Sequence, residues 1–158
     1  MSHGMGLGSV RLTVVLLAAA GAACAGGPPP PAELDTTHES CAHCRMMVSD
    51  AHFAAQIVAP GEVARFFDDV GCLAAFLREA GGVAPGALAY VADHRTAAWV
   101  VAAGAVYTRV DGLSTPMNSG IIAHADAASR EADPAAAGGT PVTQADLFGP
   151  SGPPHGAR

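Results

Sequence analysis

An ungapped internal repeat at an offset of 43 residues constrains the fold of this chain more than any other feature. Residues 48–63 read VSDAHFAAQIVAPGEV, residues 91–106 read VADHRTAAWVVAAGAV, and eight of the sixteen positions are identical. Three matches are alanines in an alanine-rich chain, but the matched valines, aspartate and glycine keep the same register. We interpret the repeat as a duplication, in which two small units cover one another's apolar faces.

Each copy of the repeat predicts a β-hairpin, because two short apolar runs are separated by a glycine-containing turn. The predicted strands are residues 54–59 and 63–67 in the first copy, and residues 97–102 and 106–110 in the second. A further strand over residues 88–93 links the two copies.

A helix is predicted after each hairpin. In the first copy, apolar residues recur at helical spacing over residues 70–80, and Asp69 is placed to act as the N-cap. In the second copy, Ser119 or Asn118 is expected to cap a helix over about residues 121–131. The sequence therefore predicts an α+β fold of two pseudo-symmetric β-β-α(-β) units packed together, with repeats at about 46–82 and 88–131.

The N-terminal region predicts an exported protein. Residues 1–23 hold Arg11, an apolar run too short to span a bilayer comfortably, and small residues ahead of Cys24. This pattern resembles a bacterial lipoprotein signal, with Cys24 as the lipid attachment site, so that acyl chains hold the protein on a membrane surface. Ordinary signal cleavage near the same place is the alternative.

Two segments rich in proline and glycine are expected to flank the folded domain. Residues 24–38 contain four consecutive prolines and predict a semi-rigid tether. Residues 132–158 predict a loosely ordered tail, with one short element around residues 142–148. The folded domain is accordingly expected over residues 39–131.

The charge of the chain argues against nucleic-acid binding. The formal net charge is −6 and there is no lysine, so no basic patch exists to neutralise phosphates. The sequence also shows no Ser, His and Asp grouping typical of a hydrolase and no phosphate-binding glycine loop, and we predict no enzymatic activity.

The segment CAHCRMM at residues 41–47 gathers two thiols, an imidazole and two thioethers. A zinc site would need a second ligand pair, but Cys72 stands alone downstream. A thioredoxin-like redox motif would need a helix after Cys41, which the sequence does not predict. A Cu(I) site needs only two or three soft ligands, so copper is favoured. Zinc, redox chemistry and a structural disulfide between Cys41 and Cys44 remain open.

A second sulfur-containing motif, STPMN at residues 114–118, precedes the predicted helix of the second copy. Met117 there occupies the strand-to-helix junction that Cys72 occupies in the first copy. Pseudo-symmetry would place both sulfur side chains near the centre of the assembly. The histidines at 43, 52, 94 and 124 are each expected to be surface residues, and Asp68, Asp69 and Asp93 to be caps or turn residues.

Taken in order, several short motifs resemble the NosL family of copper-binding lipoproteins, which are accessory factors that deliver copper to nitrous oxide reductase in the periplasm. The motifs are a lipobox, C-x2-C-x-M from Cys41, F-D-D-x-G-C ending at Cys72, Y-V-x-D ending at Asp93, and T-P-M ending at Met117. The resemblance implies two related β-β-α-β units and one Cu(I) bound by Cys44, Met46 and Met117, with Cys41 as a further candidate. Arg45 stands where the family usually has glycine.

The sequence therefore predicts a membrane-anchored, periplasm-facing Cu(I) metallochaperone. Its expected partners are a client copper enzyme, such as nitrous oxide reductase, or the assembly factors of that enzyme. The alternative is an exported thiol–disulfide redox protein that uses Cys41 and Cys44.

Overall fold

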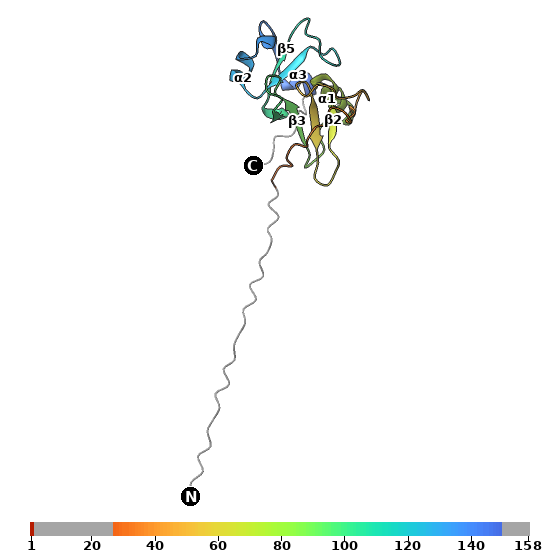
Figure 1. The fold of residues 1–158 in the computed structure, drawn as a ribbon, viewed down its shortest axis with the longest axis vertical. Helices are drawn as coiled ribbons and strands as arrows, with labels where there is room; N and C mark the ends of the chain where they lie inside the picture. Colours follow the sequence, from red (N-terminus) through yellow and green to blue (C-terminus); the bar gives the residue numbers. More distant parts are fainter. Residues whose placement is uncertain (2–26, 150–158) are drawn as a thin grey trace.

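The computed structural model describes Met1 and residues 27–149 of the chain. Two antiparallel sheets and three α-helices make up this part, which confirms the predicted α+β class (Figure 1). The predicted signal segment up to residue 26, including Cys24, lies outside the described residues, as do residues 150–158. No helix among the described residues is long and apolar enough to cross a membrane.

The first structural unit is a β-β-α-β arrangement. Its elements are β1 (Ala55–Val58), β2 (Arg65–Phe67), α1 (Val70–Ala80) and β3 (Leu88–Ala92). Strand β1 lies in the middle, with β2 antiparallel on one side and β3 antiparallel on the other. The predicted hairpin over residues 54–67 and the predicted strand over 88–93 are both confirmed.

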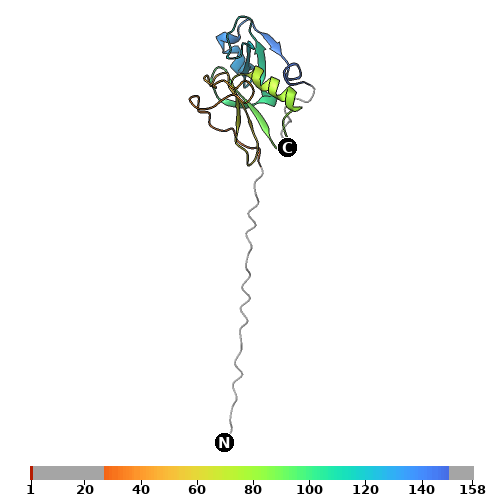
Figure 2. The same cartoon turned by 90° about the vertical axis from the view of Figure 1, so that its right-hand side faces the viewer.

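The second unit repeats this arrangement in the same order. Its elements are β5 (Val106–Arg109), β6 (Ile121–His124), α2 (Ala127–Glu131) and β7 (Thr140–Val142). Strand β5 lies between β6 and β7, just as β1 lies between β2 and β3. Helix α1 of the first unit contacts β6 of the second, so the two units bury apolar surface against each other (Figure 2).

The predicted hairpin over residues 97–110 is wrong. Strand β4 (Trp99–Val101) pairs with β3 and completes the first sheet in the order β2-β1-β3-β4, whereas β5 belongs to the second sheet. A single 3₁₀ turn, η1 (Ala102–Gly104), redirects the chain between the two sheets. The pairing of β4 depends on a partner earlier in the chain, so a nearby turn could not reveal it.

The repeat at offset 43 marks a shared turn and strand rather than the boundaries of the two units. Asp50 and Asp93 occupy equivalent repeat positions, and each accepts the backbone N–H two residues ahead in a turn that precedes a strand. The strands that follow, β1 and β4, lie on either side of β3 in one sheet. The units therefore run from 55 to 92 and from 106 to 142, and differ from the predicted repeat boundaries.

The second predicted helix begins too early. Residues Ile121–His124 form strand β6, paired along its whole length with β5, and all four residues are buried. Helix α2 starts only after Asp126, whose side chain accepts the N–H of Ser129. Ser119 and Asn118 therefore cap no helix. The two β-branched residues Ile121 and Ile122 favour a strand, because β5 offers a buried edge with which they can pair.

Helix α1 agrees with its prediction at both ends. The side chain of Asp69 accepts the N–H of Cys72 at 2.9 Å, and Gly81 ends the helix in the left-handed conformation at φ 74°. The helix buries Val70, Leu73 and Leu77 in the core. This geometry fixes the position of Cys72 on the first turn.

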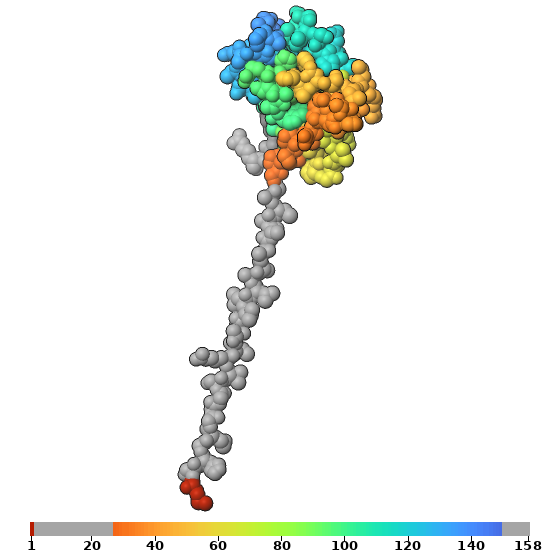
Figure 3. All heavy atoms as spheres, viewed as in Figure 1, coloured from red at the N-terminus to blue at the C-terminus, as the bar shows by residue number. Residues whose placement is uncertain are grey.

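The folded part extends beyond the expected limits of 39 and 131. On the N-terminal side, Gln56 exchanges two hydrogen bonds with the backbone of Ala32, and the Tyr90 hydroxyl donates to the carbonyl of Pro29 at 2.6 Å. Figure 3 shows this orange segment against the rest of the domain.

On the C-terminal side, the 3₁₀ turn η2 (Pro134–Ala136) and helix α3 (Gln144–Phe148) continue the fold. Leu147 and Phe148 are buried in the core, and the Phe148 ring packs edge-on against Tyr107 with centroids 5.7 Å apart. The predicted short element near residues 142–148 is therefore present as α3 and belongs to the core.

Candidate metal centre

The segment over residues 41–47 is a tight loop closed by backbone hydrogen bonds. The Cys41 N–H donates to the carbonyl of Met46 at 2.8 Å, and the Arg45 N–H donates to the carbonyl of Cys41 at 3.0 Å. Arg45 takes a positive φ of 67°, the left-handed region that costs a side chain free energy and glycine little. The loop consequently turns both thiols toward the same side.

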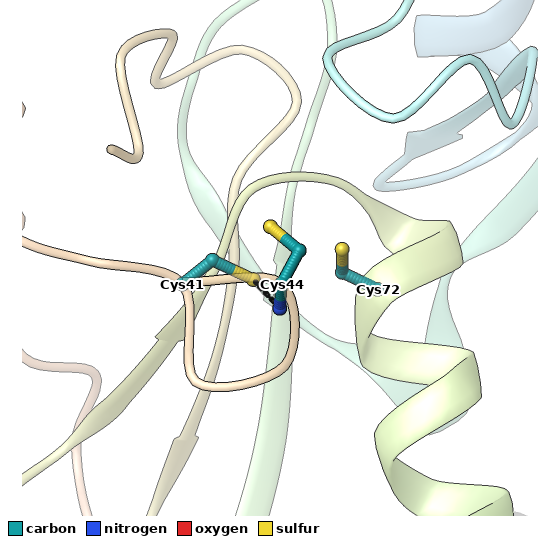
Figure 4. A group of neighbouring side chains, drawn as sticks. All are labelled: Cys41, Cys44 and Cys72. Carbon is teal, nitrogen blue, oxygen red and sulfur yellow. Dashed lines mark hydrogen bonds between the residues drawn. The ribbon is translucent and has the colours of Figure 1, made fainter. Parts of the chain in front are cut away.

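Three thiols meet where this loop faces the start of α1. The sulfur atoms of Cys41, Cys44 and Cys72 all lie within 4.8 Å of one another, and all three are free thiols. Figure 4 shows Cys41 and Cys44 on the loop and Cys72 on the first helical turn. The Cys44 N–H also points to the Cys41 sulfur at 3.5 Å. This group can hold a metal ion.

The three thiols differ in their access to solvent. Cys41 is 0% exposed and Cys72 is 2% exposed, whereas Cys44 is only half-buried. An ion held by all three sulfur atoms would therefore be enclosed on the Cys41 and Cys72 sides. Its open side would lie over Cys44.

The surroundings of the three thiols also shift their pKa values in different directions. Burial by itself would raise the pKa of Cys41, but backbone N–H groups of Cys44, Asp68 and His43 point to its sulfur and bring the pKa below its usual value. Burial raises the pKa of Cys44, and raises that of Cys72 strongly, with the charge of Cys41 adding to both shifts. Cys41 is therefore the first of the three thiols to lose its proton as pH rises. The other two thiols keep their protons until a cation replaces them.

Asp69 connects this group to the loop that carries Met117. Its Oδ2 accepts hydrogen bonds from the Thr115 hydroxyl at 2.9 Å, the Ser119 hydroxyl at 2.8 Å and the Met117 N–H at 3.3 Å. Its Oδ1 accepts the Cys72 N–H. The expected place of Met117 at a strand-to-helix junction is wrong, because residues 114–118 lie in the loop between strands β5 and β6. The backbone of this loop nevertheless contacts Asp69 at the start of α1.

The side chains of the two methionines named with Cys44 are exposed to solvent. Met46 is 54% exposed and Met117 is 39% exposed. Met46 contributes its carbonyl to the loop, and Met117 contributes its N–H to Asp69. Their role as ligands stays a prediction, whereas the structure places Cys41 and Cys72 beside Cys44.

Cys72 is the member that the predicted ligand set of Cys44, Met46, Met117 and Cys41 did not include. The available signal was its position three residues after the N-cap Asp69, which fixes it on the first turn of α1. Its neighbour Asp68 also differs from its predicted role as a cap or turn residue. Asp68 is 1% exposed, its Oδ1 has no hydrogen-bond partner among the described residues, and burial beside the Asp69 carboxylate raises its pKa.

The predicted surface position of the histidines is wrong for His124. Its side chain is 0% exposed, because β6 lies inside the second unit. His52 is exposed, as predicted, and His43 is partly buried with its Nδ1 at 3.8 Å from a carboxylate oxygen of Glu79. Neither joins the cysteine group.

Comparisons of the chain with protein-family models, with curated proteins and with solved structures find no match.

Proposed function

We propose that the protein is a Cu(I)-binding metallochaperone, and that Cys41, Cys44 and Cys72 hold the ion. The observation that carries this proposal is the approach of three free thiols to within 4.8 Å of one another. Thiolates are soft ligands that favour Cu(I), and low-coordinate Cu(I) needs no fourth protein ligand.

The absence of a fourth ligand in the described part of the chain argues against a structural zinc site, and the soft donors favour copper. A structural zinc site takes four protein ligands in a tetrahedron. Among the described residues, no further Cys, His, Asp or Glu joins the three cysteines. The exposed thioethers of Met46 and Met117 are neutral soft donors suited to Cu(I) and are not typical zinc ligands.

The open side over Cys44 suits transfer of the ion. Incoming donors from a client can approach there and replace the protein ligands one at a time, with Met46 and Met117 as the weakly held neutral donors. The sequence resemblance makes nitrous oxide reductase or its assembly factors the proposed client. It also makes a lipid-anchored, periplasm-facing location part of the proposal.

A thiol–disulfide redox function using Cys41 and Cys44 is the second candidate. The lowered pKa of Cys41 favours it, because a thiolate is the attacking species in disulfide exchange. Two observations weigh against it: the Cys41 sulfur is fully buried, and the cysteines lie in a turn rather than at a helix N-terminus.

An anaerobic competition titration against a chromophoric Cu(I) chelator tests the proposal. The wild-type chain should bind one Cu(I). Cys44→Ser and Cys72→Ser should each weaken binding by more than the roughly 10- to 100-fold that loss of an outer-shell partner costs. Unchanged affinity in both variants would refute the proposal.

The same titration tests whether Met46 and Met117 contribute to Cu(I) binding. Met46→Ala and Met117→Ala should weaken binding by a smaller factor than the cysteine variants. Met47→Ala is the matched control, because Met47 is a similarly exposed thioether on the same loop. Catalytic disulfide turnover, insensitive to Met117→Ala, would instead favour the redox candidate.

A further inference from the structure

A second group of metal-ligating side chains lies in the other half of the molecule. His94 follows β3 in a turn, His124 is the last residue of β6, and Asp133 is the N-cap of η2. His94 Nδ1, His124 Nε2 and the carboxylate of Asp133 lie within 4.8 Å of one another. None of these residues belongs to the cysteine group.

Both imidazoles converge on a single oxygen atom. Asp133 Oδ2 lies 2.6 Å from His94 Nδ1 and 2.9 Å from His124 Nε2. The other oxygen, Oδ1, accepts the N–H of Ala135 at 2.9 Å, which holds the carboxylate in place. The backbone of His94 is also fixed, because its N–H donates to the carbonyl of Ala123 at 2.8 Å.

The group carries a buried negative charge without a permanent positive partner. Asp133 is 7% exposed, and its ion pairs within the described part of the chain are with His94 and His124 alone. Three groups, His94 Nδ1, His124 Nε2 and the Ala135 N–H, converge on the two oxygens of this carboxylate, which is therefore held in place as an acceptor between the two imidazoles.

We propose that His94, His124 and Asp133 form a binding site for Zn²⁺. Two imidazole nitrogens and one carboxylate oxygen are the protein ligands of several zinc sites that leave a fourth position open. This nitrogen and oxygen set is harder than the thiol group around Cys44, so the two sites select different ions. The inference does not depend on copper binding at the cysteines.

The carboxylate oxygen needs only a small adjustment to accept the ion, and the two nitrogens, which lie within 4.8 Å of each other, would approach to the spacing that zinc ligands take. With zinc–ligand bonds of about 2.0–2.1 Å, tetrahedrally placed ligand atoms lie about 3.3 Å apart. The carboxylate oxygen would therefore move away from the two nitrogens by about half an ångström. His94, which is 15% exposed, lies between the buried group and solvent and marks the route of entry.

Zinc binding to the two neutral imidazoles releases no net proton to solvent. A carboxylate only accepts hydrogen bonds, so His94 Nδ1 and His124 Nε2 carry the protons when no ion is bound. Zn²⁺ replaces both protons when each moves to the other nitrogen of its own ring. The receiving nitrogen of His124, Nδ1, is buried and has no hydrogen-bond partner among the described residues, which lowers the affinity.

Long-range ¹H–¹⁵N spectra of the imidazole groups test the inference directly in the full chain. Addition of Zn²⁺ should produce a saturable loss of the Nδ1 proton of His94 and the Nε2 proton of His124. Zinc held by the cysteines would leave these nitrogens unchanged. Unaltered His94 and His124 signals at saturating Zn²⁺ would overturn the inference.

Variants give a second measurement of the same site. His94→Gln and Asp133→Asn should raise the Zn²⁺ concentration at half-saturation of the His124 signal by at least about tenfold. His38→Gln is the matched control, because His38 Nδ1 lies 2.8 Å from Asp35 Oδ2 in an exposed pair without a second imidazole. Equal half-saturation in wild type and His94→Gln would also overturn the inference. If a variant fails to fold, the wild-type spectrum still decides.

Discussion

Cys72 and Met117 are bound through their backbone N–H groups to the two oxygens of one carboxylate. Asp69 Oδ1 accepts the Cys72 N–H at 2.9 Å, and Asp69 Oδ2 accepts the Met117 N–H at 3.3 Å. Asp69 is fully buried, so these bonds are protected from competing water. The residue that caps α1 therefore also sets the position of the second sulfur-bearing loop.

Asp69→Ala should destabilise the protein by about 2–4 kcal/mol. Loss of an N-cap costs about 1 kcal/mol, and the Thr115 and Ser119 hydroxyls would lose a buried acceptor. The free energy of unfolding in urea measures this cost. Asp126→Ala is the control, because that exposed residue caps only α2 and should cost about 1 kcal/mol. Equal losses in the two variants would contradict the bridging role.

Gly71→Ala should separate the Met117 loop from α1. A Cβ at Gly71 would lie 2.6 Å from the Cβ of Ser119, closer than two carbon atoms can approach. Alanine otherwise stabilises a helix by about 1 kcal/mol over glycine, so a net loss of stability would report the clash. The Tm and the Cu(I) affinity should both fall. In Gly104→Ala, where the added Cβ meets open space, neither should.

Arg45→Gly should stabilise the cysteine loop by about 1 kcal/mol, because Arg45 occupies the left-handed region. Arg45→Ala separates conformation from charge, since alanine removes the guanidinium and keeps the unfavourable φ. Thermal unfolding of the three proteins checks the order. A gain in Arg45→Ala equal to that in Arg45→Gly would assign the effect to the side chain instead.

Cu(I) affinity should rise with pH. The pKa values of Cys44 and Cys72 are raised, mainly by burial, so both thiols hold protons at neutral pH and lose them to the metal. Two competing protons give a slope of up to about two log units per pH unit. Competition titrations between pH 6 and 8 measure it. An affinity independent of pH would show that these thiols do not bind as thiolates.

Asp93 should contribute to an acid-sensitive junction between the two halves. Burial would raise its pKa, but hydrogen bonds from Ser129, Ala125 and Thr96 hold it at about 2, below the ordinary 3.8. Because the folded pKa is the lower one, this stability is present above about pH 4 and is lost as pH falls toward 2.

Asp93→Asn should therefore cost about 2 kcal/mol at pH 7 and flatten the loss of stability between pH 4 and 2. Urea unfolding at several pH values measures both effects. Asp126→Asn is the control, since asparagine caps a helix as well as aspartate does. If Asp93→Asn lost as much stability between pH 4 and 2 as the wild type does, Asp93 would not be the source of the acid sensitivity.

Features encoded locally could be predicted from the sequence. Helix α1 and its cap follow from apolar spacing and one aspartate, and the hairpin of β1 and β2 follows from a short turn. The contact of the Met117 loop with Asp69 was not among these features, because that loop joins β5 to β6 and does not precede a helix.

Features decided by distant partners could not be predicted. Residues 121–124 fit either a helix or a strand, and the choice depends on the edge that β5 provides. Strand β4 pairs backward with β3 rather than forward with β5. No further Cys or His lies close to Cys72 in the sequence to indicate a ligand pair, so only the folded backbone places it beside Cys41 and Cys44.

The contacts of Pro29 and Ala32 have a mechanical consequence. The chain ahead of Cys41 is fastened to β1 through Gln56 and to β3 through Tyr90. A pull on the chain from its N-terminal side is therefore transferred to the two central strands of the first sheet before it reaches the cysteine loop. The spacing of the three thiols is shielded from tension along the leading segment.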